Sequence, residues 1–69
     1  MNRRTFKATV ARLFAKANPG AVATWAHGPV AVTWADGSKG LSGVLQASGA
    51  GYRARAMVAT YHDGGVWIQ

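Results

Sequence analysis

The sequence predicts an α+β fold in which one N-terminal amphipathic helix packs on a four- to five-stranded antiparallel β-meander. Two observations lead to this prediction. Apolar residues recur at helical period as far as residue 17, and from residue 21 onward the period changes to two, with turn residues at short intervals. A chain of 69 residues has room for one domain only, which we expect to span residues 1–69.

Residues 3–17 are predicted to form the helix. The apolar positions that share one side of it are Phe6, Val10, Leu13, Phe14 and Ala17. Arg12 and Lys16 lie on the opposite side, one turn apart. Asn18-Pro19-Gly20 ends the helix, because proline lacks the amide donor and pushes the residue before it out of the helical region.

The remainder, about 21–69, is predicted to be the sheet. The candidate strands are about 21–27, 29–35, 40–47, 52–61 and 65–69. A weak repeat of the form Thr-aromatic-x-[His/Asp]-Gly occurs at 24–28, 33–37 and 60–64. In each copy a β-branched residue and an aromatic residue finish a strand, and a short polar residue and glycine form the turn. The repeat favours the hairpin ends of a meander.

Side chains alternate along a strand, so each strand divides its residues between two faces of the sheet. The set predicted to face the helix is Val30, Val32, Trp34, Leu41, Leu45, Ala54, Ala56, Val58, Val66 and Ile68. The set predicted to face away is Trp25, Thr33, Val44, Arg53, Arg55, Met57, Tyr61 and Trp67. A one-residue bulge would exchange part of the two sets.

The charge of the chain points to an anionic partner. The formal net charge is +6, because eight Lys and Arg residues are opposed by Asp36 and Asp63 alone. Such an imbalance favours nucleic acid or an acidic, nucleic-acid-handling protein as partner, although it also keeps a small protein soluble. No apolar run is long enough for a signal peptide or a membrane span, so we expect a cytoplasmic protein without a membrane partner.

An arginine- and aromatic-rich sheet face is the predicted binding site. Bases stack on exposed rings while guanidinium groups neutralise phosphates, as on the sheet surfaces of several RNA-binding modules. The residues predicted to bind nucleic acid or another partner are Trp25, Arg53, Arg55, Tyr61 and Trp67, together with Arg12, Lys16 and Lys39. The sequence therefore indicates a small, non-enzymatic nucleic-acid-binding protein.

Other interpretations use the same residues. Trp, Tyr, Met and Arg are also enriched in protein interfaces, so the face is also compatible with a homodimer interface or with plain cross-strand pairing. A homodimer is expected because the core is thin: the chain has 14 Ala and 9 Gly but three Leu and one Ile. The alternative function is a phage or regulatory protein that inhibits a host complex, in the manner of an anti-CRISPR.

A third, weaker hypothesis is a small ribonuclease. His27 and His62, with a lysine such as Lys39, have the chemistry for general acid–base cleavage of RNA. The chain has no cysteine, and no spacing of His, Asp or Glu matches a known metal-ligand set, so neither a metal nor a cofactor is expected.

Overall fold

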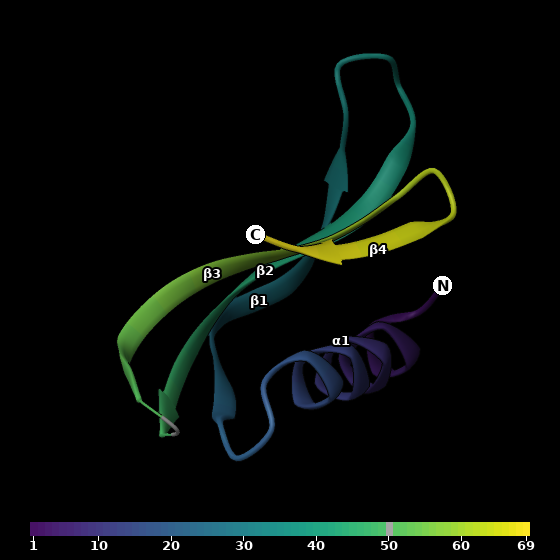
Figure 1. Cartoon of the computed structure of the whole chain (residues 1–69). Helices are drawn as coiled ribbons and strands as arrows, with labels where there is room; N and C mark the ends of the chain where they lie inside the picture. Colours follow the sequence, from purple (N-terminus) through teal and green to yellow (C-terminus); the bar gives the residue numbers. More distant parts are fainter. Residues whose placement is uncertain (50) are drawn as a thin grey trace.

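The computed structural model describes residues 1–49 and 51–69, and within residues 52–54 it describes the backbone alone. The elements are α1 (Arg3–Ala17), β1 (Val22–Thr33), β2 (Lys39–Gly49), β3 (Tyr52–His62) and β4 (Gly65–Ile68) (Figure 1). The strands pair antiparallel in the order β1-β2-β3-β4. The predicted α+β fold, one helix on a four-stranded antiparallel meander, is confirmed.

Helix α1 begins and ends where its capping residues predict. The side-chain oxygen of Asn2 accepts a hydrogen bond from the backbone N–H of Thr5 at 2.8 Å, which satisfies a donor that the first turn leaves free. At the other end the N–H of Asn18 donates to the carbonyl of Phe14 at 2.9 Å, and Pro19 prevents a further turn. The observed bounds equal the predicted ones.

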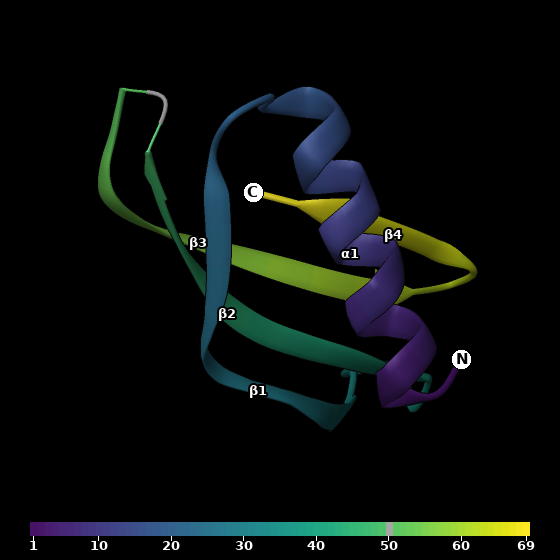
Figure 2. The same cartoon turned by 90° about the horizontal axis from the view of Figure 1, so that it is seen from below.

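Helix α1 lies across one face of the sheet and leaves the other face without a covering element in the described chain (Figures 1 and 2). We call these the inner and the outer sheet face. Phe6 and Val10 of the helix pack on Leu41, Leu45 and Ala59 of the inner face. Partly buried hydrophobic residues surround this core: Ala23, Trp25, Met57, Tyr61, Val66 and Ile68. Leu13, which was expected in the apolar stripe, is 36% exposed at its edge.

Two of the predicted strands form one. Segments 21–27 and 29–35 are joined in β1, which continues through Gly28-Pro29 with register shifts between Trp25 and His27 and between His27 and Val30. Gly28 takes a positive φ of 73°, which bends the strand without a clash. Because a bulge leaves a residue outside the hydrogen-bonded ladder, proline is tolerated there. The predicted turn is therefore a bulge.

The bulge in β1 and a tight turn after β3 decide which residues of these two strands face the helix, and the result differs from the prediction. Asp63 and Gly64 both have positive φ, 53° and 79°, which is the backbone of a two-residue type I′ hairpin. This turn pairs His62 with Gly65 and Tyr61 with Val66, so Tyr61 shares a face with Val66 and not with Trp67. Val66 and Ile68 pack on the core as predicted, and they bring Tyr61 with them.

Several predicted orientations are consequently wrong. Trp25, Met57 and Tyr61 were expected to face away from the helix, and all three pack against the core. Thr33 and Arg55, expected on the same side, also take inner-face positions in the register. The residues expected to face the helix but found on the other side are Val30, Val32, Trp34, Ala56 and Val58, while Ala54 lies outside the described side chains. Burying methionine and tyrosine removes more apolar surface from water than burying alanine, which explains the orientation of β3. The predictions for Leu41, Leu45, Val44 and Trp67 are confirmed.

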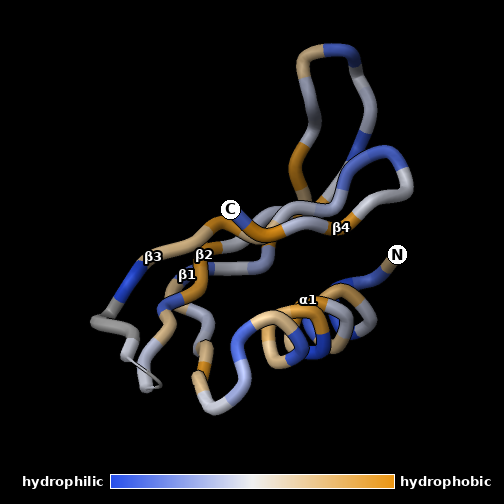
Figure 3. The backbone as a smooth tube through the Cα atoms, in the orientation of Figure 1, coloured by the Kyte–Doolittle hydropathy of each residue, from blue (hydrophilic) through white to orange (hydrophobic). Residues whose placement is uncertain are grey.

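The outer sheet face is formed at its centre by Val30, Ser42, Val44, Val58, Thr60 and Trp67. The register places these residues in two rows, in which Val30, Ser42, Thr60 and Trp67 are successive partners across the four strands and Val44 is opposite Val58. Figure 3 shows hydrophilic residues at the turns and on α1, with the middle of the sheet pale to hydrophobic.

Candidate nucleic-acid interface

Helix α1 is basic along its whole length. Its cationic residues are Arg3, Arg4, Lys7, Arg12 and Lys16, all of them exposed. The helix has no acidic residue at all. Arg12 and Lys16 are four residues apart and lie opposite Phe6 and Val10, because successive residues advance by 100° around a helix. The packing of the apolar stripe on the sheet thus turns two adjacent positive charges toward solvent.

The two acidic residues lie away from this helix, in turns of the sheet. Asp36 is in the turn between β1 and β2, and Asp63 is in the turn between β3 and β4. The carboxylate of Asp36 accepts hydrogen bonds from the backbone N–H of Ser38 at 2.9 Å and from its hydroxyl at 2.6 Å. These bonds lower the pKa of Asp36 below its ordinary value of 3.8, so this charge persists in acid.

Ser38 connects the two turns. Its hydroxyl oxygen is 2.7 Å from Nε2 of His62 as well as 2.6 Å from the Asp36 carboxylate. A hydroxyl has one proton, and a carboxylate only accepts, so Ser38 donates to Asp36 and accepts from Nε2–H of His62. This order differs from a nucleophilic triad, in which histidine takes the proton of serine. In the described geometry Ser38 and Asp36, in the turn between β1 and β2, are linked to His62 at the end of β3.

The predicted arginine- and aromatic-rich face does not form as one surface. Trp25 and Tyr61 belong to the inner face and pack beside α1, whereas Trp67 belongs to the outer face and is 40% exposed. Arg55 is exposed on β3, opposite Ala47 of the inner face. The side chain of Arg53 lies outside the described residues. Of the predicted residues, the structure brings Arg12 and Lys16 together and separates the aromatic ones.

A second aromatic group on the outer face was missed. The ring of Trp34 lies 4.7 Å from that of His62, centroid to centroid, and its Nε1 is buried without an acceptor among the described residues. The ring of Trp67 lies over Gly65, the partner of His62, since a Cβ on that glycine would be 3.4 Å from Cζ3 of the indole. The sequence feature that could have predicted this group is the Asp63-Gly64 dipeptide, because its two-residue turn sets the register of this end of the sheet.

The two histidines of the ribonuclease hypothesis are not adjacent. His27 is opposite Val44 of β2, whereas His62 follows Tyr61, the partner of Leu41. The two histidines are therefore offset by four residues along β2, which corresponds to roughly 13 Å, and they also lie on different strands. General acid and base groups that act on one phosphodiester both have to reach it, usually by direct hydrogen bonds. The described geometry gives this pair no common site.

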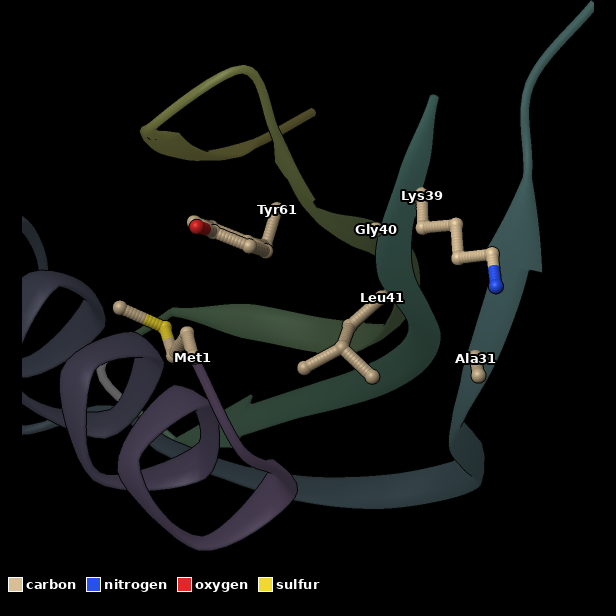
Figure 4. A pocket seen from close by; sticks show the side chains of 6 residues that line it. All are labelled: Met1, Ala31, Lys39, Gly40, Leu41 and Tyr61. Carbon is tan, nitrogen blue, oxygen red and sulfur yellow. The ribbon is translucent and has the colours of Figure 1, made fainter. Parts of the chain in front are cut away.

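A shallow pocket of about 350 Å³ lies beside the N-terminal end of α1, where the helix no longer covers the sheet. Its lining residues are Met1, Ala31, Lys39, Gly40, Leu41 and Tyr61 (Figure 4). The Tyr61 ring lies beside Met1, and Lys39 extends toward β1 on the opposite side (Figure 4). Lys39, predicted as a binding residue, is therefore exposed at the rim of this pocket and apart from the basic side of α1.

Within residues 1–49 and 51–69, no group of three or more His, Asp or Glu side chains is placed to hold a metal ion. No helix in the same part of the chain has the length and apolar character needed to cross a membrane. Comparison of the chain with protein-family models, with curated proteins and with solved structures finds no match.

Proposed function

We propose that the protein binds nucleic acid through phosphate contacts made by the exposed side of α1. The observation that carries the proposal is the charge distribution of this helix: five exposed cations and no acidic residue, in a chain of net charge +6. Arg12 and Lys16 form its centre, because they lie one turn apart and opposite the buried stripe. Two adjacent cations neutralise more phosphate charge than an isolated cation does.

The binding mode differs from the stacking mode that the sequence suggested. Trp25 and Tyr61 pack in the core region, and Trp67 and Trp34 lie on the side of the sheet away from the helix. A strand of nucleic acid held by α1 therefore meets no described tryptophan on that side. Recognition is then electrostatic, with little dependence on base sequence and a strong dependence on salt.

The test is fluorescence anisotropy of labelled single-stranded RNA, single-stranded DNA and duplex DNA at several salt concentrations. Two double variants carry the same net charge: Arg12→Ala with Lys16→Ala on the helix, and Lys39→Ala with Arg55→Ala on the sheet. Alanine is the best helix former, so the first variant keeps α1 intact. Each lost phosphate contact lowers the slope of log K against log salt by about 0.7 for single strands and about 0.9 for duplex DNA.

We expect the helix variant to lose roughly two such units of slope and the sheet variant to bind nearly as the wild type does. Equal weakening in both variants would mean that only net charge matters. A larger loss of slope in the sheet variant than in the helix variant would favour the arginine-bearing end of the sheet as the binding surface. No binding by the wild type at low salt would end the proposal and favour the alternative function, a protein that docks on another protein.

A further inference from the structure

The outer sheet face is uncharged in a strongly basic protein. Among the side chains that the structure describes, the charged ones lie on α1, in the two acidic turns, or on inner-face positions such as Lys39 and Arg55. The ionisable groups at the borders of the outer face are His27, opposite Val44, and His62. Val30 is 51% exposed, Val58 43% and Trp67 40%, so the apolar part of this face is in contact with solvent.

We infer that a second copy of this chain covers the outer sheet face, giving a symmetric dimer in which two sheets pack back to back. The occupied surface is centred on Val30, Ser42, Val44, Val58 and Trp67, with Thr60 between them already buried in the single chain. Depletion of charge and enrichment of tryptophan are the compositional marks of an interface core. A surface that is apolar at its centre is complementary to itself, as a two-fold axis requires.

The exposed area of the single chain is larger than its mass predicts. Its accessible surface is 4645 Å², whereas a compact monomer of 7.2 kDa exposes about 4,100 Å². The radius of gyration is 12.2 Å, against about 11 Å for a compact chain of 69 residues. The excess of roughly 500 Å² goes with the elongated shape of the chain, 39 × 18 × 17 Å, and with a sheet that α1 covers on one face.

The dimensions of the molecule are sufficient for a stable interface. The chain measures 39 × 18 × 17 Å, so a face with the two longer dimensions has an outline of roughly 700 Å². Specific, stable protein interfaces bury about 600–1,000 Å² per partner, so an interface over this whole outline falls near the lower end of that range. Two twisted sheets pack with their strands within about 30° of each other, which lets the two rows of outer-face residues interdigitate.

The arrangement also separates the like charges of the two copies. Packing through the outer faces leaves each α1 on the outside of a four-layer assembly. At about 10 Å per layer, the two basic helices are roughly 30 Å apart. This is more than three times the screening length of about 8 Å at physiological ionic strength. Contact through the helix sides would instead bring ten cations together, five from each chain.

The experiment measures the mass of the full chain by light scattering and by sedimentation equilibrium over a range of micromolar concentrations. We expect the wild type to show twice the mass of 7.2 kDa, with dissociation on dilution. Val58→Lys and Val30→Lys, separately, place a charge at the centre of the interface and are expected to yield monomers. Thr33→Lys is the matched control, because Thr33 is exposed, lies in the same strand as Val30 and alternates to the other face.

Circular dichroism distinguishes an unfolded variant from a folded monomer. If both valine variants unfold, a monomeric wild type still overturns the inference, because that measurement needs no substitution. A wild type that is monomeric at every concentration would overturn the inference, even if a different protein were found to bind this face. Dimers that persist in folded Val30→Lys and Val58→Lys variants, or that dissociate equally in Thr33→Lys, would place the interface elsewhere.

Discussion

The indole of Trp25 occupies the space in which residue 43 would carry its side chain. A Cβ on Gly43 would be 2.5 Å from Cζ3 of Trp25 and 3.0 Å from the carbonyl oxygen of His27. From the other side, the ring of Phe6 approaches Trp25 with a centroid distance of 5.9 Å and an interplanar angle of 45°. The side chain of Trp25 is thus held between the helix and the backbone of β2.

Gly43→Ala is expected to destabilise the protein by about 1–3 kcal/mol, because the added methyl group displaces an indole that is already confined by Phe6. Urea denaturation followed by circular dichroism measures the free energy of unfolding. Gly65→Ala is the control, since a Cβ there meets only ordinary van der Waals contacts. A loss of stability no greater for Gly43→Ala than for Gly65→Ala would refute this packing arrangement.

Phe6→Ala is expected to cost about 3–5 kcal/mol, because Phe6 is fully buried between α1 and the sheet. A domain of this length has a total stability of roughly 3–10 kcal/mol, so a large part of the population should unfold. Leu13→Ala, on the same helix and 36% exposed, should cost much less. The comparison is made by thermal and urea denaturation. Similar losses for both residues would contradict the observed orientation of the helix.

Asp36→Asn is expected to lower the free energy of unfolding at neutral pH and to make it fall less on acidification than in the wild type. The folded pKa of Asp36 is lowered by its hydrogen bonds with Ser38, so the unfolded chain takes up the proton first as the pH falls. The stabilisation is complete above the ordinary value of 3.8 and is lost as the pH falls through the lower, folded value. The difference in unfolding free energy between wild type and variant should therefore shrink in that range. Asp63→Asn is the charge-matched control, and an identical pH profile in both variants would argue against the Ser38 contact.

Ser38→Ala is expected to cost about 1 kcal/mol, because it removes the partner of both His62 and Asp36 at a half-buried position. The loss should be smaller in the background of Asp36→Asn, since the two residues share one hydrogen bond. A double-mutant cycle by urea denaturation measures this coupling. Strictly additive losses would show that the hydrogen bond between Ser38 and Asp36 contributes nothing.

Trp67→Ala is expected to leave nucleic-acid affinity unchanged, because Trp67 lies on the outer sheet face and the proposed phosphate contacts lie on α1. Anisotropy titration with single-stranded RNA and DNA checks this. A stacked base contributes roughly 1–3 kcal/mol, so a loss of fivefold or more in affinity would restore the sheet as the binding surface.

The helix and the existence of a meander were predictable because their signals are local. The apolar stripe of residues 3–17 and the stop at Asn18-Pro19 depend on neighbours within one or two turns. The paired strands likewise follow from alternation and from Gly-containing turns. The basic character of α1 was also predictable, since it depends only on which residues lie outside the apolar stripe.

The faces of the strands were not predictable by the same means. Alternation assigns two sets of residues but does not say which set is buried, and each bulge exchanges them. In β1 the shift around Gly28-Pro29 separates Trp25 from Val30, and in β3 the type I′ turn at Asp63-Gly64 separates Tyr61 from Trp67. An error of one residue in either place removes the aromatic residues from the predicted binding face.

The sequence by itself determined the fold class, the helix bounds and the charge of the chain, because periodicity, capping and composition act over short distances. Only the tertiary structure decided that Trp25 is held between Phe6 and Gly43. It also decided that the charged helix and the uncharged outer sheet face are on opposite sides of the molecule. The physical reason is that one helix can cover only one of the two faces of the sheet. The face that is covered is the one whose burial removes more apolar surface from water.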